Sequence, residues 1–87
     1  MNQPNQPPPY DILPYSDKNG ALYLGNLRSA GYYWAEPGHF AVTLEGRSPL
    51  GKRIAHTGTC NAIEVAESVC HLWVTEGRIS PNFVEVK

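Results

Sequence analysis

The stretch that decides the fold runs from residue 61 to residue 77 and reads NAIEVAESVCHLWVTEG. Its apolar residues return at steps of three and four, the spacing that places side chains on one face of a helix. The apolar stripe consists of Ala62, Val65, Ala66, Val69, Leu72 and Trp73. The opposite face carries Glu64, Glu67, Ser68, His71 and Thr75. The stretch therefore predicts one amphipathic helix that packs its stripe against the rest of a small domain.

Both ends of this helix carry recognisable signals. Asn61, followed three residues later by Glu64, has the form of a capping box, so we expect the helix to begin at Ala62. Gly77 is the residue type that ends helices in a left-handed conformation.

The segments before the helix have the patterns of strands. Residues 39–45, HFAVTLE, place Phe40, Val42 and Leu44 on one face. Residues 31–35 are rich in aromatic side chains, which favour a half-buried pleated surface. A Pro-Gly turn separates the two segments. Together they predict an antiparallel pair.

Two further strands are expected, less strongly patterned than these, and a third segment is a candidate short strand that is not counted in the sheet. Residues 52–57 resume the sheet after a loop and stop at the Thr-Gly-Thr sequence of residues 57–59, which we interpret as a breaker. Residues 21–24 predict a short strand. Residues 82–86 alternate again after the helix and predict a final strand.

These elements predict a two-layer α+β domain over residues 20–87, with an antiparallel sheet of three to four strands on one helix, in the order β-β-β-α-β. Residues 1–14 form a Pro-rich N-terminal tail, of which at least residues 1–9 are expected to be disordered because they lack large apolar side chains. The P-P-x-Y form of residues 7–10, which WW domains bind, is an alternative role for this tail. The apolar residues between Tyr10 and Tyr15 are expected to lie against aromatic side chains of the sheet.

Composition excludes several classes of partner and compartment. Seven Lys and Arg against eight Asp and Glu give a net charge of -1, which exerts no overall attraction toward nucleic acid or an anionic membrane. No apolar run approaches the ~18 residues of a membrane span, and the N-terminus lacks the layout of a signal peptide. We therefore expect a cytoplasmic protein. Cys60 and Cys70 lie too far apart along the helix for a disulfide, so we expect reduced thiols, with Cys70 in the core.

The sequence shows no spacing typical of a catalytic or metal site. His39, His56 and His71 are isolated, and the spacing of His56 and His71 relative to the two cysteines matches no common zinc pattern. We predict no catalytic residue, no metal and no cofactor, and hence a protein that is not an enzyme.

Two features instead predict a binding surface. Tyr32, Tyr33 and Trp34 are consecutive and cannot all face the core of a sheet that one helix covers. The hairpin after the second main strand carries a local basic cluster. The predicted partner-binding residues are Tyr32, Tyr33, Trp34, Arg47, Lys52 and Arg53. Self-association through the aromatic residues and an ordinary solvated hairpin are the alternatives.

The turn and strand of residues 37–45, PGHFAVTLE, and the segment of residues 80–84, SPNFV, resemble small phage-encoded anti-CRISPR inhibitors of type I-F systems. The Gly-Thr turn at residues 58–59, followed by a helix, is similar to HicB-type antitoxin domains, although the family's proline-glycine-cysteine turn is missing. Both resemblances imply a compact domain that occupies a surface on another macromolecule.

We therefore expect a small non-enzymatic protein that binds a larger protein or complex of the host and inhibits or modulates it, as a phage or mobile-element inhibitor of a host system such as CRISPR does. The alternative is a nucleic-acid-binding regulator, or antitoxin-like domain, that uses the basic hairpin.

Overall fold

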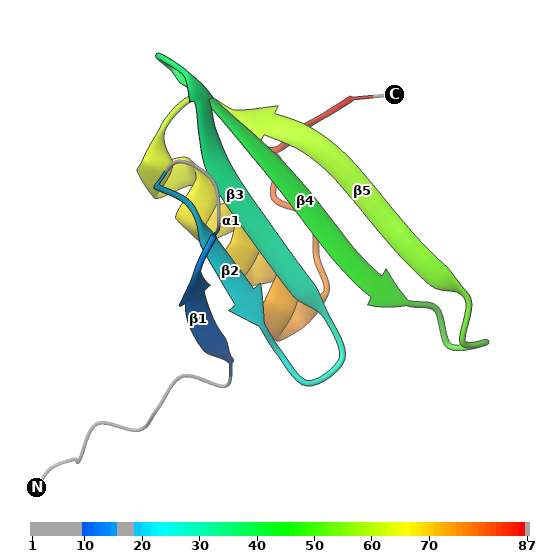
Figure 1. Ribbon diagram of the computed structural model, residues 1–87. Coiled ribbons are helices and arrows are strands. Elements are labelled where there is room, and N and C mark those ends of the chain that lie inside the picture. The colour runs from blue at the N-terminus through cyan, green and yellow to red at the C-terminus, as the bar shows by residue number, and fades with distance from the viewer. Residues whose placement is uncertain (1–9, 16–18, 87) are drawn as a thin grey trace, which may run out of the picture.

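The computed structural model describes residues 10–15 and 19–86, and in these residues it contains one sheet and one helix (Figure 1). All neighbouring strands pair antiparallel, and their order across the sheet equals their order in the sequence. The helix lies across one face of the sheet. The elements are β1 (Asp11–Pro14), β2 (Ala21–Leu24), β3 (Ser29–Glu36), β4 (His39–Arg47), β5 (Arg53–Cys60), α1 (Ile63–Glu76) and β6 (Val84–Glu85).

The α+β class and the single helix against an antiparallel sheet are confirmed, whereas the predicted number of strands is wrong. The sheet has six strands rather than three to four, in the order β-β-β-β-β-α-β. Strand β1 falls inside the segment predicted as a tail. Its two apolar residues, Ile12 and Leu13, are adjacent rather than alternating, and Pro14 is tolerated because β1 lies at the edge of the sheet. The predictions for residues 1–9 lie outside the described residues.

The breaker predicted at residues 57–59 is also wrong, because β5 continues through Gly58 to Cys60. Gly58 is buried and pairs with Glu85 of β6. A Cβ atom at this position would lie 2.3 Å from the carbonyl oxygen of Val84 and 2.7 Å from the ring of Phe83. The glycine is therefore required for close packing within the strand and does not end it.

One end of α1 agrees with the sequence and the other does not. The predicted capping box is wrong: Ala62 is the N-cap, in an extended conformation, with no side-chain cap, and the helix begins at Ile63. Gly77 ends the helix as predicted, with φ 70° and its N–H donating to the carbonyl of Trp73. The Arg28 guanidinium reinforces this end, because its Nε donates to the same carbonyl at 2.7 Å.

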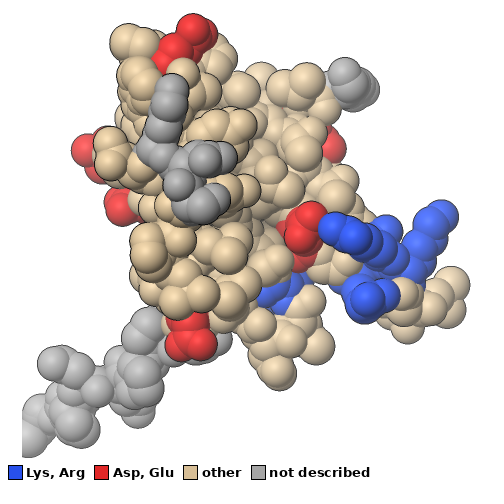
Figure 2. Space-filling model, viewed as in Figure 1, with Lys and Arg blue, Asp and Glu red and all other residues tan. Residues whose placement is uncertain are grey.

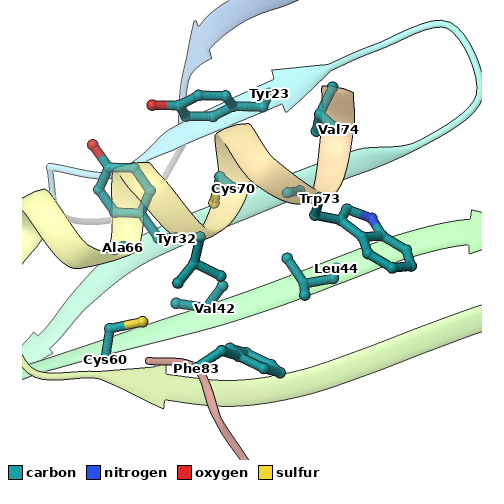
Figure 3. Packing of buried hydrophobic residues seen from close by; sticks show 12 residues of the cluster. Tyr23, Tyr32, Val42, Leu44, Cys60, Ala66, Cys70, Trp73, Val74 and Phe83 are labelled. Carbon is teal, nitrogen blue, oxygen red and sulfur yellow. The ribbon is translucent and has the colours of Figure 1, made fainter. Parts of the chain in front are cut away.

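The core lies between α1 and the sheet (Figure 3). The sheet contributes large side chains such as Tyr23, Tyr32 and Leu44, and α1 contributes its buried face, including Cys70 and Trp73. Both cysteines are free thiols and buried, and the core position of Cys70 is as predicted. The predicted placement of both along one helix is wrong, because Cys60 is the last residue of β5. The indole Nε1 of Trp73 donates to the carbonyl of Glu45 at 3.0 Å, so the largest helix side chain also has its polar atom satisfied.

Burial alternates along the central strands and defines the two faces of the sheet. Val42 and Leu44 are 1% and 0% exposed and face α1. Their neighbours Ala41, Thr43 and Glu45 point to the other side, which no element of the described chain covers. We call this second side the open face.

Candidate partner-binding surface

The open face is a broad surface without charge at its centre. Strand register assigns side chains to it, because directly paired residues share a face. Its residues include Leu13, Leu22, Tyr33, Ala41, Thr43, Ala55, Thr57 and Thr59. Figure 2, viewed from this side, shows mostly uncharged atoms, with a carboxylate and neighbouring Lys and Arg atoms to the right of the middle. The fold therefore presents to solvent a mostly apolar and threonine-rich surface.

The three consecutive aromatic residues separate, as their alternation requires. Tyr32 is 4% exposed, faces α1 and donates a hydrogen bond from its hydroxyl to Glu67 at 3.4 Å. Trp34 is half-buried and pairs with Phe40, whose ring contacts Tyr32, so it lies on the helix side. Tyr33 is half-buried on the open face. Of the predicted aromatic residues, only Tyr33 is presented by the open face, and Tyr32 belongs to the core.

Tyr15 extends the aromatic area around Tyr33. The two ring centroids lie 5.6 Å apart. The Tyr15 ring also packs over Gly31, where a Cβ atom would lie 2.7 Å from it. The predicted contact of residues 10–15 with sheet aromatics is seen here, while Tyr10 lies on the helix side with its ring 5.2 Å from that of Tyr23.

The predicted basic cluster is brought together at one end of the sheet, by the β4–β5 hairpin. Arg47, Lys52 and Arg53 are all exposed there. Figure 2 shows Lys and Arg atoms gathered at the lower right, where Figure 1 places this hairpin. Nη2 of Arg53 donates to Oε2 of Glu45 at 3.0 Å, and Nη1 of Arg47 donates to the Gly51 carbonyl at 3.0 Å.

The hairpin loop is held in shape by Ser48. Its Oγ accepts hydrogen bonds from the backbone N–H groups of Leu50 and Lys52, at 3.3 and 3.1 Å. Its own N–H donates to the Lys52 carbonyl at 2.7 Å. Gly51 adopts φ 83°, which the loop needs and which side-chain-bearing residues rarely adopt. The basic side chains thus project from an ordered loop.

A groove lies between this hairpin and the β2–β3 loop, with a volume of about 860 Å³. We call it the basic groove. It is lined by Gly25, Asn26, Leu27, Arg28, Ser29, Glu45, Gly46, Arg47, Ser48, Pro49 and Arg53. Sequence reasoning missed the side formed by Leu27 and Arg28, since these residues stand far from the hairpin in the chain. One signal in the sequence could have found it. Leu27 directly follows Gly25 and Asn26, a turn sequence in which a core residue is not expected, so an exposed leucine could have been predicted there.

The histidines and cysteines are dispersed over the fold. His56 Nδ1 lies 2.8 Å from Oε2 of Glu85, and His39 Nδ1 lies 3.9 Å from Glu36. Burial raises the pKa of the Cys60 thiol and raises that of Cys70 to about 12, which keeps both thiols protonated at neutral pH. Among the described residues, no three His, Cys, Asp or Glu side chains gather to hold a metal ion.

Comparisons of the chain with models of protein families, with curated proteins and with solved structures return no match. The resemblances to anti-CRISPR inhibitors and HicB-type antitoxins therefore stay predictions. In residues 10–15 and 19–86, no helix has the length and apolar character needed to cross a membrane.

Proposed function

We propose that this protein is a small non-enzymatic binding protein that occupies a surface on a larger macromolecule and thereby inhibits or modulates it. The observation that carries the proposal is the open face of a sheet whose other face is buried under α1, a face on which Glu45 and Arg53 form an ion pair toward the β4–β5 hairpin and the other strand residues named above are uncharged (Figure 2). A chain of 87 residues has little surface to spare, so a broad face with exposed Leu13 and half-buried Tyr33 favours a recognition role.

The chemistry of the open face suits burial against another macromolecule. Desolvating charges is costly, and the centres of protein interfaces are depleted in charged residues and enriched in tyrosine. The Tyr15–Tyr33 pair supplies aromatic area, while Thr43 and Thr57 supply hydroxyl groups for hydrogen bonds. An inhibitor of a host complex, as implied by the resemblance to phage-encoded inhibitors, is one form that such a protein takes.

A charge placed on the open face tests the proposal. Thr57 is exposed in β5, so Thr57→Lys adds a cation to the face without disturbing the core. Ser68→Lys, on the exposed side of α1, is the matched control. Affinity capture from a lysate of the source cells should return a protein with the wild type and with Ser68→Lys but not with Thr57→Lys. Capture that is the same for all three proteins, or absent for the wild type, would contradict the proposal.

A second candidate is a nucleic-acid-binding regulator, favoured by the exposed cluster of Arg47, Lys52 and Arg53. Contacts with phosphates release counterions, so the affinity for duplex DNA would fall steeply with salt. Measuring that affinity by fluorescence anisotropy across a salt series tests this candidate. Weak or salt-independent binding would exclude it.

A further inference from the structure

The charges of this protein are distributed very unevenly. Arg28, Arg47 and Arg53 line the basic groove, and Lys52 stands on the same hairpin. Among the described acidic residues only Glu45 lines the groove. Four cations and one carboxylate give this end a formal charge of +3, whereas the other three cations and seven acids leave the rest of the chain at -4. The near-zero net charge thus hides a strongly basic end.

The cations of the groove are held in place before any partner arrives. Arg28 is fixed by donating to the carbonyls of Trp73 and Val74 at the end of α1, at 2.7 and 3.5 Å. Arg47 donates to the Gly51 carbonyl of the ordered hairpin loop. Arg53 is paired with Glu45, which neutralises the only acidic group among the described lining residues. Side chains oriented in advance lose less conformational entropy on binding.

Large apolar side chains flank these cations. Leu27 lines the groove and is 73% exposed, and Leu50 at the tip of the hairpin is 96% exposed. Pro49, which directly precedes Leu50 in the chain, also lines the groove. Burial of these two leucines adds little to the stability of the fold, because both stay largely in contact with water. The groove therefore combines positive charge with apolar contact points.

We propose, resting on the partner-binding function above, that the basic groove binds an acidic segment of a partner protein in which apolar side chains stand among the carboxylates. The carboxylates pair with Arg47 and Lys52, and arginine offers the fork of donors that fits a carboxylate. The apolar side chains of the segment cover Leu27 and Leu50. This site is continuous with the open face through Glu45 and Arg53, so one partner can cover both surfaces.

An acidic polypeptide fits the groove better than a nucleic acid does. Proteins that bind single strands stack the bases on aromatic side chains, and none of the lining residues that the structure describes is aromatic. A duplex spreads its charge along its length, and beyond the groove it would meet a chain whose remaining residues carry net negative charge. Exposed leucines, in contrast, have a direct use in contacts with protein side chains.

A titration of the full-length ¹⁵N-labelled protein tests this proposal. The probe is a capped synthetic hexadecapeptide of glutamate with leucine at every fourth position. Saturable shifts of amide signals confined to residues 25–29 and 45–53, with affinity that falls as salt is added, are expected. Arg47→Glu should weaken binding about tenfold or more, the effect of opposing a charge across an interface. Arg78→Glu makes the same charge change at an exposed arginine outside the groove and should leave the affinity within about twofold.

Three further probes give outcomes that decide between partners. A peptide with glycine in place of leucine should bind more weakly, and a peptide with lysine in place of glutamate should not bind. Equal binding of either would overturn the proposal. Tighter binding of an oligothymidylate of equal length, with shifts in the same residues, would replace it with a nucleic-acid site. If Arg47→Glu unfolds, Lys52→Glu provides the same comparison. The hydrogen bonds of Lys52 with described residues come from its backbone, so replacing its side chain removes none of them.

Failure here and failure of the proposed function are distinguishable. If the glutamate-leucine peptide leaves the spectrum unchanged while Thr57→Lys still abolishes capture of a partner, the groove assignment is wrong and the binding function stands. If the peptide binds but no partner is captured by any variant, the open-face function is wrong and the groove remains a site for acidic segments.

Discussion

The phenolic oxygen of Tyr10 lies 2.7 Å from Nδ1 of His71, a hydrogen bond that joins the start of the sheet to the outer side of α1. The two rings meet edge to face, with centroids 5.6 Å apart. Tyr10 directly precedes β1, which pairs with the rest of the sheet along only one side. This contact therefore fastens the edge strand to the helix.

Tyr10→Phe should loosen β1 while keeping the packing of the ring. Loss of one hydrogen bond at an accessible site lowers the free energy of unfolding by about 0.5–1.5 kcal/mol. Urea denaturation gives that value, and amide exchange should quicken at residues 12–14 and their partners in β2. Tyr33→Phe is the matched control, since the Tyr33 hydroxyl makes no hydrogen bond with other described residues. Equal stability of the two variants would show that the bond to His71 contributes nothing.

Arg28→Met should destabilise the fold more than an ordinary surface substitution. It removes the charged donor from the Trp73 and Val74 carbonyls at the end of α1, and such bonds contribute about 1.5–3 kcal/mol. Arg78→Met is the control, because Arg78 is exposed and, with the described residues, makes a single long ion pair of 3.7 Å with Glu76. Urea midpoints should fall for Arg28→Met alone, and a similar fall for both variants would argue against helix capping by Arg28.

Gly58→Ala should be strongly destabilising although alanine is a small change. The new Cβ would clash with the Val84 carbonyl and the Phe83 ring, so β6 must move, at a cost of about 1–3 kcal/mol. Thermal unfolding measures the effect. The control Thr57→Ala changes an exposed neighbour in the same strand and should cost about 0.5 kcal/mol or less. An unchanged melting temperature for Gly58→Ala would mean that β6 does not pack on β5 as described.

Stability should fall at alkaline pH because the fold keeps buried acids protonated. Burial raises the pKa of Tyr32 to about 12 and that of Cys70 to about 12, and it also raises the pKa values of Tyr23 and Cys60. In the unfolded chain thiols ionise near pH ~8.5 and phenols near pH ~10. Above those values the unfolded state binds fewer protons than the folded state, so the free energy of unfolding decreases as pH rises.

The expected profile is a flat stability below about pH 8 and a progressive loss between about pH 9 and 12. Urea denaturation at a series of pH values measures it. Cys70→Ala removes the most buried thiol and should flatten the part of the decline that begins near pH ~8.5. A wild-type stability that stays constant to about pH 11 would contradict the burial of these groups.

Local signals in the sequence predicted the elements whose own residues carry their pattern. Alternation in β4, aromatic density in β3 and the three-and-four spacing of α1 all predicted the observed structures. Gly77 ends the helix as predicted, because glycine adopts the left-handed conformation of a helix C-terminus without help from distant residues. The free thiols were also predicted, but the reason given was wrong, because Cys60 ends β5 and only Cys70 lies in α1.

The elements that were missed depend on a distant partner. Strand β1 pairs with the nearby β2, but the contact that fastens its start comes from α1, where His71 bonds Tyr10. Strand β5 continues through Gly58 because Phe83 and Val84 pack on it. The capping box predicted at Asn61 also failed. Strand β5 extends to Cys60, so Asn61 directly follows a strand, and the N-cap of the helix is Ala62.

The sequence by itself determined the class of the fold and the two kinds of chemistry offered for binding, aromatic and basic. Tertiary structure alone decided which of these groups are exposed at the surface. Register buries Tyr32 and turns Tyr33 outward, and the meander brings Leu27 and Arg28 to the hairpin cations. The physical reason is that a side chain's exposure is set by what packs over it, and for this sheet the cover is one helix on one face.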